Sequence, residues 1–277
     1  MGHMATIIIP AHNESTVIRR CLDSVVNQQG VNQIIVACNG CTDNTVSIVQ
    51  AYGDQVTCLE LSKPSKVFAL NEAEKLIQSW PVFYIDADTE LLDGCIERVV
   101  QGMDERQLLL AAPEPEIRLD ESSWLVKQYY KIWYQLPYIK SGLVGTCSFV
   151  LAQNGRERFD RFPDIISDDG FVRAQFEDHE RGNVPGSGIV IQAPRNLKSL
   201  IKIKTRSQLG MMELRAKGLM RFQEQKSYPN SLSSHLFSKN WLAASVYIAL
   251  ALFMKLRARL QSTRMNTYQW ETDHSSR

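Results

Sequence analysis

The sequence predicts an α/β fold, with a mostly parallel sheet flanked by helices and a helical segment toward the C-terminus. Two observations support this fold class. Short apolar runs alternate with single helical patterns, which is typical of parallel strands joined by right-handed crossovers. The runs are also apolar without interruption, as strands of a sheet covered on both faces must be.

Strands and helices are expected to alternate through the first half of the chain. Apolar runs predict strands at 6–10, 34–37, 56–61, 82–85 and 108–112. Apolar residues at helical spacing predict a helix in each intervening segment, and they lie within 17–26, 46–49, 67–77 and 96–100.

The alternation stops after residue 112. Residues 112–124 are rich in proline and acidic residues and are interpreted as a connection. Residues 124–139 form a dense aromatic stretch with a helical pattern, which is more often core than ligand platform. A glycine-bounded strand and turn are expected within 141–159, and an amphipathic run follows Asp168 and Asp169.

The composition excludes some functions. Lys plus Arg is 31 and Asp plus Glu is 30, so no basic field indicates nucleic acid. The six cysteines are dispersed and no signal-peptide pattern precedes them, which favours a reducing cytoplasm. Cys38 and Cys41 form a C-x-x-C, for which a turn of small residues is favoured over redox chemistry or half a zinc site. Gly2 and His3 are interpreted as an expression-tag remnant.

Polar stretches stand where four of the predicted strands end. They are "PAHNE" (10–14), "CNGCTD" (38–43), "SKPSK" (62–66) and "DADTE" (86–90). Ligands of open α/β sheets bind at the carboxyl ends of the strands, so these stretches predict a binding site. The chain has neither G-x-G-x-x-G nor G-x-x-x-x-G-K-[ST], so neither a dinucleotide fold nor a P-loop is supported.

Asp86 and Asp88 follow a buried strand and are separated only by Ala87. Burying two carboxylates so close together costs free energy unless a positive charge balances them. A hard divalent cation, Mn²⁺ or Mg²⁺, would supply that charge and bridge to the phosphates of a nucleotide diphosphate.

Five motifs in order give the chain a family resemblance. "TIIIPAHNE", "NGCTDNT", "KVFALNEA", "YIDADTEL" and "SDDGFVR" together resemble a bacterial-type, membrane-associated family 2 glycosyltransferase, over about residues 5 to 206. The resemblance implies the GT-A fold, whose sheet is Rossmann-like. It also implies an inverting reaction on a nucleotide-diphosphate sugar, with Mn²⁺ or Mg²⁺ as cofactor.

The resemblance implies roles on the donor side. Pro10, Ala11, His12, Asn13 and Glu14 would line the nucleotide, with Asn39 available to the base and Lys66 near the donor. Asp86 would contact ribose or metal, Ala87 would lie beside the nucleotide, and Asp88 would be the main metal ligand. Arg206, with Lys204 behind it, is the candidate for the diphosphate.

On the acceptor side, Asp169 matches the family's catalytic base, and its neighbour Asp168 would raise its pKa or position the acceptor. Without the other motifs, both would be interpreted as a helix cap and a first-turn acid. Cys38 departs from the family, which carries an acid there that binds the base. A thiol is a poor acceptor, so Asn39 or backbone groups would replace it.

The implied division has three parts. Residues 4–112 would bind the nucleotide sugar, 113–210 would bind the acceptor and carry the base, and 211–277 would form a helical segment at a membrane surface. Residues 241–254 are an apolar run of 14, too short for a bilayer span of about 20, followed by a basic stretch. A core helix and a helix on an anionic membrane surface both fit, the second slightly better.

The favoured function is therefore metal-dependent transfer from a UDP-sugar to a lipid-linked or polysaccharide-precursor acceptor, at the cytoplasmic face of the bacterial inner membrane. The Arg-Trp motif of processive synthases is missing, which favours a single addition. Two alternatives are a degenerate transferase that binds nucleotide or a partner without turnover, and a sugar-phosphate nucleotidyltransferase, which lacks its Gly-rich loop here. His179 is a less favoured metal ligand.

Overall fold

The computed structural model describes residues 4–136, 139, 147–222 and 238–262. The chain forms two units. Unit 1 comprises Met1–Ile117, Gly145–Asp164 and Gln175–Ile191, and unit 2 comprises Arg118–Val144, Ile165–Ala174 and Gln192–Arg277. The three-part functional division expected from the sequence stays a prediction.

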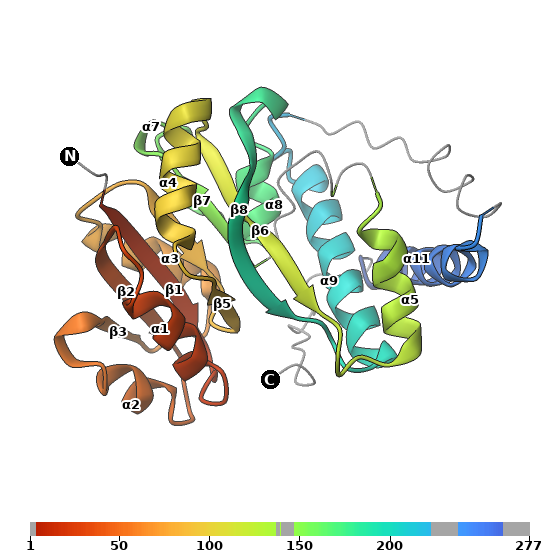
Figure 1. Cartoon of the computed structure of the whole chain (residues 1–277), viewed down its shortest axis with the longest axis horizontal. Coiled ribbons are helices and arrows are strands. Elements are labelled where there is room, and N and C mark those ends of the chain that lie inside the picture. The colour runs from red at the N-terminus through yellow and green to blue at the C-terminus, as the bar shows by residue number, and fades with distance from the viewer. Residues whose placement is uncertain (1–3, 137–138, 140–146, 223–237, 263–277) are drawn as a thin grey trace. The chain divides into compact units, whose positions relative to one another are not determined.

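Unit 1 is built on a sheet whose described strands run in the order β3-β2-β1-β4-β7-β6-β8-β5 (Figure 1). The strands are β1 (Ala5–Ala11), β2 (Val31–Asn39), β3 (Thr57–Leu61), β4 (Val82–Ile85), β5 (Thr89–Leu91), β6 (Leu110–Arg118), β7 (Ser148–Leu151) and β8 (Arg181–Gln192). The α/β class expected from the sequence is thereby confirmed.

The parallel part of the sheet is its N-terminal half. β2 pairs with β1 and β3, and β1 pairs with β4, all in parallel. The later strands pair antiparallel: β7 with β4 and β6, and β5 with β8. The strands predicted at 6–10, 34–37, 56–61 and 82–85 therefore form the parallel half, and their carboxyl ends lie at one edge of it.

Part of the expected connection after residue 112 is strand. β6 continues to Arg118 through Pro113 and Pro115, so interpreting the whole of 112–124 as a connection was wrong. Its last five residues alternate between exposed and half-buried side chains, and its pairing with β7 covers Leu110 and Ala111. Proline is tolerated where the strand position needs no N–H donor, so these prolines did not mark the end of the strand.

Helices cover the sheet of unit 1. The helices are α1 (Ile18–Val26), α2 (Thr45–Gln50), α3 (Lys66–Ala73), α4 (Cys95–Arg106) and α7 (Gln153–Arg156), with 3₁₀ turns η1 (Gly53–Gln55), η2 (Glu74–Leu76) and η3 (Asp178–Glu180). Burial of the predicted face of α1, with Cys21, Leu22 and Val25, confirms its helical spacing. These side chains join Ile9 and Phe83 of the strands in one apolar core.

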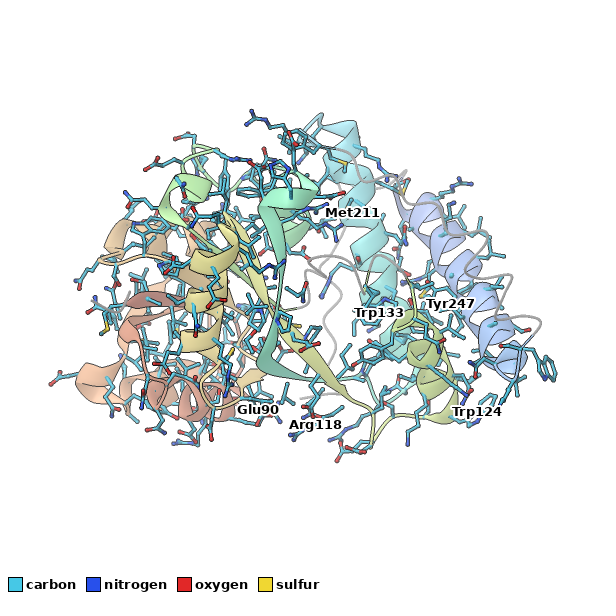
Figure 2. The ribbon with its side chains drawn as sticks, turned by 45° about the horizontal axis from the view of Figure 1, so that its top comes forward. Glu90, Arg118, Trp124, Trp133, Met211 and Tyr247 are labelled. Carbon is cyan, nitrogen blue, oxygen red and sulfur yellow. The ribbon has the colours of Figure 1, made fainter. Side chains whose placement is uncertain are left out.

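Unit 2 is helical in its described part, with α5 (Trp124–Trp133), α8 (Asp168–Arg173), α9 (Leu197–Ala216) and α11 (Trp241–Ser262) (Figure 1). α11 packs against both α5 and α9. Ile132 of α5 is buried with Ala243 and Ala244 of α11. The Tyr129 and Tyr247 rings stack with their centroids 4.9 Å apart, and Figure 2 labels Tyr247 on the side of α11 that faces α5.

α11 is longer than the apolar run that predicted it, because the basic residues continue the helix to Ser262. The prediction that this segment is too short to span a bilayer, which rested on its 14 apolar residues, was therefore wrong. Among the described residues, α11 is the one helix whose length and apolar composition suffice to cross a membrane, and only 22% of its apolar window is buried in the protein. Residues 263 and 264, the end of the basic stretch, lie outside the described residues.

Candidate active site

The Asp86–Asp88 turn leaves the carboxyl end of β4 and enters β5. The Asp86 carbonyl oxygen accepts hydrogen bonds from Thr89, at 2.6 Å from Oγ1 and 3.2 Å from N. The Asp86 N–H donates to the carbonyl of Cys147, at 2.8 Å. Bonds on both sides of Asp86 therefore fix the backbone that carries the two half-buried carboxylates.

Arg20 of α1 contacts the end of this turn, at Asp88 and Glu90. Its Nε lies 2.9 Å from Oε1 of Glu90, the residue labelled on β5 in Figure 2. Its Nη2 donates to the Asp88 carbonyl at 3.5 Å. No role for Arg20 or Glu90 was predicted from the sequence, because only the fold brings the Arg20 guanidinium to this turn.

Lys66, the first residue of α3, forms an ion pair with Asp86. Its Nζ lies 2.8 Å from Asp86 Oδ1, and both side chains are about one-third exposed. Ser65 caps α3, since its Oγ accepts a hydrogen bond from the Phe68 N–H. The capped start of α3 therefore directs the side chain of Lys66 toward Asp86. Within the protein, the ammonium group of Lys66 balances the negative charge of Asp86.

Hydrogen bonds join the ends of β1 and β2. The amide of Asn39 donates to the Ala11 carbonyl at 2.9 Å, and His12 Nδ1 lies 2.6 Å from the Asn39 carbonyl oxygen. Asn13 adopts a left-handed backbone, with φ of 55°, and its Oδ1 accepts from the Thr42 N–H at 2.7 Å. Residues 10–13 and Asn39 thus lie together, as the sequence predicted for strand ends at one edge.

Asp43 and Thr45 anchor Glu14, which is buried. The Glu14 N–H donates to Thr45 Oγ1 at 2.8 Å, and Thr45 Oγ1 donates to Asp43 Oδ1 at 2.5 Å. Burial opposes the charge of Asp43, but hydrogen bonds from Thr45 and Ser15 outweigh it and lower its pKa to about 2. The "CTDNT" stretch was quoted as a motif, yet the role of these two side chains in holding the loop was missed.

Cys38, at the position where the family carries an acid, is buried at the end of β2. A hydrogen bond with Cys41 and burial raise the pKa of Cys38, and the same bond lowers the pKa of Cys41. The Sγ of Cys41 donates to the Ala11 carbonyl oxygen at 3.4 Å, which ties this pair to the end of β1. All six cysteines are free thiols.

One group of side chains in the described residues has metal-ligand geometry. One carboxylate oxygen of Asp86, one of Asp88 and Sγ of Cys147 all lie within 4.8 Å of one another. Two carboxylates and one further donor, all half-buried, fit a divalent cation that keeps positions open for phosphate oxygens. His179 is not in the group, and its Nδ1 instead lies 3.5 Å from a Glu177 carboxylate oxygen.

Asp168 and Asp169 begin α8 in unit 2. Asp168 is 5% exposed and Asp169 is half-buried, with its Oδ1 accepting a hydrogen bond from Ser167 Oγ at 2.8 Å. Gly210 of α9 lets the two helices approach, because a Cβ there would lie 2.6 Å from Cβ of Ser167. The acidic pair thus rests on a tightly packed contact between α8 and α9.

Arg206 and Lys204 also lie on α9, and both are half-buried. Lys204 Nζ lies 4.6 Å from the centre of the Trp133 ring, on the aromatic face of α5. Tyr129, Tyr130 and Trp133 are buried, so this part of the aromatic stretch is core, whereas Trp124 is exposed (Figure 2). Residues 141–146, the start of the glycine-bounded segment predicted at 141–159, lie outside the described residues.

The Rossmann-like sheet flanked by helices matches the fold of solved GT-A glycosyltransferases, and the acidic cluster lies at the carboxyl ends of its strands, where ligands of open α/β sheets bind. The model of the family "Glycosyl transferase family 2" matches residues 6–153, more than half of the sequence. The chain therefore belongs to that family.

Curated relatives support this over short regions. The chain is 33% identical over 98 residues to the chondroitin synthase of Pasteurella multocida (strain Pm70) and, over the same length, to the hyaluronan synthase of Pasteurella multocida. It is 24% identical over 136 residues to the uncharacterised glycosyltransferase YibD of Escherichia coli (strain K12). These matches cover 34%, 34% and 48% of this chain, but only 10%, 10% and 38% of the respective relatives.

Solved structures share the fold at low identity. A Pyrobaculum calidifontis mannosyltransferase in complex with GDP-Man and Mn²⁺ aligns with a TM-score of 0.64 and 16% identity, over 97% of this chain and 82% of that one. A Mycobacterium tuberculosis glucosyl-3-phosphoglycerate synthase with Mn²⁺ and UDP aligns at 0.56 and 17%, over 81% and 82%. Staphylococcus aureus TarS with UDP-GlcNAc aligns at 0.54 and 12%, over 96% and 93%.

Proposed function

We propose that this chain is a glycosyltransferase and that it binds a nucleotide-diphosphate sugar, with a UDP-sugar favoured, at the strand-end site of unit 1. The observation that carries the proposal is the convergence of Asp86, Asp88 and Lys66 at the carboxyl edge of β4. Residues 10–14 and Asn39 line the nucleotide beside them, and Ala87 is buried between the two carboxylates. Asp88 and Asp86 would hold Mn²⁺ or Mg²⁺, which supplies neutralising charge to the diphosphate when bound.

The reaction is proposed to invert the anomeric centre in one displacement. Asp169 accepts the proton of an acceptor hydroxyl while that oxygen bonds to the anomeric carbon. The bond from this carbon to the diphosphate breaks on the opposite face, and the electron pair leaves with the nucleotide diphosphate. Lys66 and Arg206 stabilise the charge that develops on the leaving group. Asp168 positions the acceptor, which is proposed to be lipid-linked or a polysaccharide precursor and to receive a single sugar.

Calorimetric titration tests the donor site. UDP, GDP, CDP and dTDP are each titrated with and without Mn²⁺ into the wild-type chain and Asp88→Ala. The proposal expects one diphosphate to bind only with metal and Asp88→Ala to abolish that binding. Binding of none of the four in the presence of metal would contradict it.

Turnover of the matching nucleotide sugar tests the base. Asp169→Asn keeps the size of the side chain and removes the proton acceptor, so the rate should fall by about 10²–10⁴ with nucleotide affinity unchanged. Glu177→Gln, an exposed carboxylate in the segment after α8, is the matched control and should keep the wild-type rate. Equal rates for Asp169→Asn and wild type would exclude Asp169 as the base.

We also propose that the outer face of α11 lies on an anionic membrane surface at the cytoplasmic side of a bacterial inner membrane. Leu252 is 63% exposed, Phe253 51%, Leu256 57% and Leu260 66%, at the spacing of one helix face. The exposed Lys255 and Arg259 accompany them on the same two turns. Apolar side chains beside cations are typical of helices that bind anionic lipid.

Vesicle flotation tests this placement. Leu252→Glu/Leu256→Glu should lose binding to anionic vesicles, and Lys255→Glu/Arg259→Glu should lose the preference for anionic over neutral lipid. Leu76→Glu, which alters an exposed leucine of unit 1, is the control. Unchanged flotation of Leu252→Glu/Leu256→Glu would contradict the placement.

A further inference from the structure

We propose that Cys147 is a third protein ligand of the metal site, so that the site presents two carboxylates and one thiolate. The inference rests on the proposed donor site and deepens it. The sequence analysis recognised only Asp86 and Asp88, because Cys147 lies about sixty residues further along the chain. The ligand atoms of the three residues nevertheless lie within 4.8 Å of one another.

Strand pairing explains how Cys147 reaches the carboxylates. β4 and β7 are antiparallel, and their register pairs Ile85 with Ser148. One residue beyond that pair, Asp86 stands opposite Cys147, and the Asp86 N–H donates to the Cys147 carbonyl at 2.8 Å. The register therefore brings the backbones of Asp86 and Cys147 side by side just beyond the two strands, and the thiol sulfur and the Asp86 carboxylate lie within 4.8 Å of each other.

The backbone at Cys147 is also specialised. Its φ is +61°, in the left-handed region that residues other than glycine, asparagine and aspartate rarely occupy. The chain turns there immediately before β7 begins at Ser148. Together with the hydrogen bond from Asp86, this turn holds the side chain of Cys147 in the cluster, half-buried like the two carboxylates.

A thiolate changes which cations the site prefers. Carboxylates alone suit Mg²⁺, whereas a sulfur ligand favours softer ions such as Zn²⁺ and Cd²⁺ and weakens the preference for Mg²⁺. Binding replaces the S–H bond by a sulfur–metal bond and releases the proton to solvent. A mixed site should therefore bind Cd²⁺ more tightly than an all-oxygen site does, and Mn²⁺ more tightly than Mg²⁺.

Cadmium provides a readout that does not depend on turnover. The full-length chain is titrated with Cd²⁺ without nucleotide, and the ultraviolet thiolate-to-cadmium band is recorded for wild type and Cys147→Ala. The difference between the two spectra isolates Cys147 from the other five cysteines. Cys58→Ala, on β3 three strands from β4 in the sheet, is the matched control and should keep this band.

Asp88→Asn distinguishes a shared site from a lone thiol. Losing even an outer partner of a metal site costs about tenfold or more in affinity. Asp88→Asn should therefore weaken Cd²⁺ binding at the Cys147 band by at least that factor, and Cys147→Ala should weaken Mn²⁺ binding similarly. Cys147→Ser, which keeps the size and offers oxygen, should lose Cd²⁺ affinity while retaining Mg²⁺ affinity.

Two results would overturn the inference. One is a Cys147→Ala spectrum identical to that of wild type, and the other is a Cys147 band whose Cd²⁺ affinity is unaffected by Asp88→Asn. Either could occur while a nucleotide diphosphate still binds only with Mn²⁺ and Asp88. In that case the proposed donor site would stand and only the thiolate ligand would fail.

Discussion

The ammonium group of Lys66 lies 2.8 Å from Asp86 Oδ1 and brings positive charge to the carboxylate pair from within the protein. Lys66 is the first residue of α3, and Asp86 directly follows β4. Two separate βα units therefore supply the opposing charges. Because Lys66 pairs with one oxygen of the Asp86 carboxylate, the second oxygen can still bind a cation. The positive charge of Lys66 therefore affects how tightly Asp86 and Asp88 would bind a cation.

Replacing Lys66 should change metal and nucleotide affinity in opposite directions. Lys66→Met removes a cation next to Asp86, so Mn²⁺ should bind the nucleotide-free chain about fivefold more tightly, which corresponds to about 1 kcal/mol of screened Coulomb repulsion. The nucleotide diphosphate should bind more weakly, because its phosphates lose a positive partner. Calorimetry measures both affinities.

Lys63→Met is the matched control, because it removes the same charge from an exposed lysine in the loop just before α3. It should leave both affinities near those of wild type. If Lys63→Met and Lys66→Met behaved alike, the effect would come from net charge rather than from the contact with Asp86.

Filling the gap at Gly210 should disturb the segment that carries Asp169. A Cβ there would lie 2.6 Å from Cβ of Ser167, and neither helix can yield without moving residue 167. Gly210→Ala should destabilise the fold by about 1–3 kcal/mol, as overpacked cores do, and should lower the turnover rate. Urea unfolding and donor turnover are the measurements. Ser207→Ala, on the exposed side of α9, should change neither.

Removing the guanidinium of Arg156 should be strongly destabilising. Its Nε and Nη2 each lie 2.6 Å from the carboxylate of Glu74, and Tyr84 donates to that carboxylate at 2.5 Å. The side chains of the pair are 15% and 10% exposed, so Arg156→Met would leave a buried charge without its partner. The expected loss of unfolding free energy is about 3–5 kcal/mol.

The pair of the exposed Lys75 and the half-buried Glu72 provides the comparison for Arg156. Lys75→Met should cost less than about 0.5 kcal/mol, because solvent screens a surface pair. A similar loss in both variants, measured by urea unfolding, would show that burial of the Arg156 pair contributes little.

Acid should remove the stabilisation that Arg158 provides. The hydrogen-bonded ion pair with Arg158 lowers the pKa of Glu180 to about 2, from an ordinary value of 4.5. Because the folded pKa is the lower one, the stabilisation is complete above about pH 4.5 and disappears as the pH falls toward about 2. The difference in unfolding free energy between wild type and Arg158→Met should therefore be constant near neutral pH and shrink below about pH 4.5. A difference that stays constant down to about pH 3 would contradict the assignment.

Local patterns in the sequence determined the parallel half of the sheet and the residues at its carboxyl edge. An unbroken apolar run such as 82–85, standing between two helical patterns, indicates a buried strand, and the polar residues after it then lie at the edge. The extent of β6 was missed because its prolines look like loop residues when the neighbouring strands are unknown. The length of α11 was underestimated because charged residues continue a helix whose apolar face ends earlier.

The tertiary structure alone decided the contacts between distant segments. Arg20 reaches Asp88 and Glu90 only because α1 packs beside β5, and no spacing in the sequence records that packing. Cys147 joins the carboxylates only because the β4–β7 register places it opposite Asp86. Side-chain periodicity reports which face of an element is buried, but the partner of that face depends on pairing and register, which involve residues far apart in the chain. The carboxylates could therefore be predicted from sequence, and their neighbours could not.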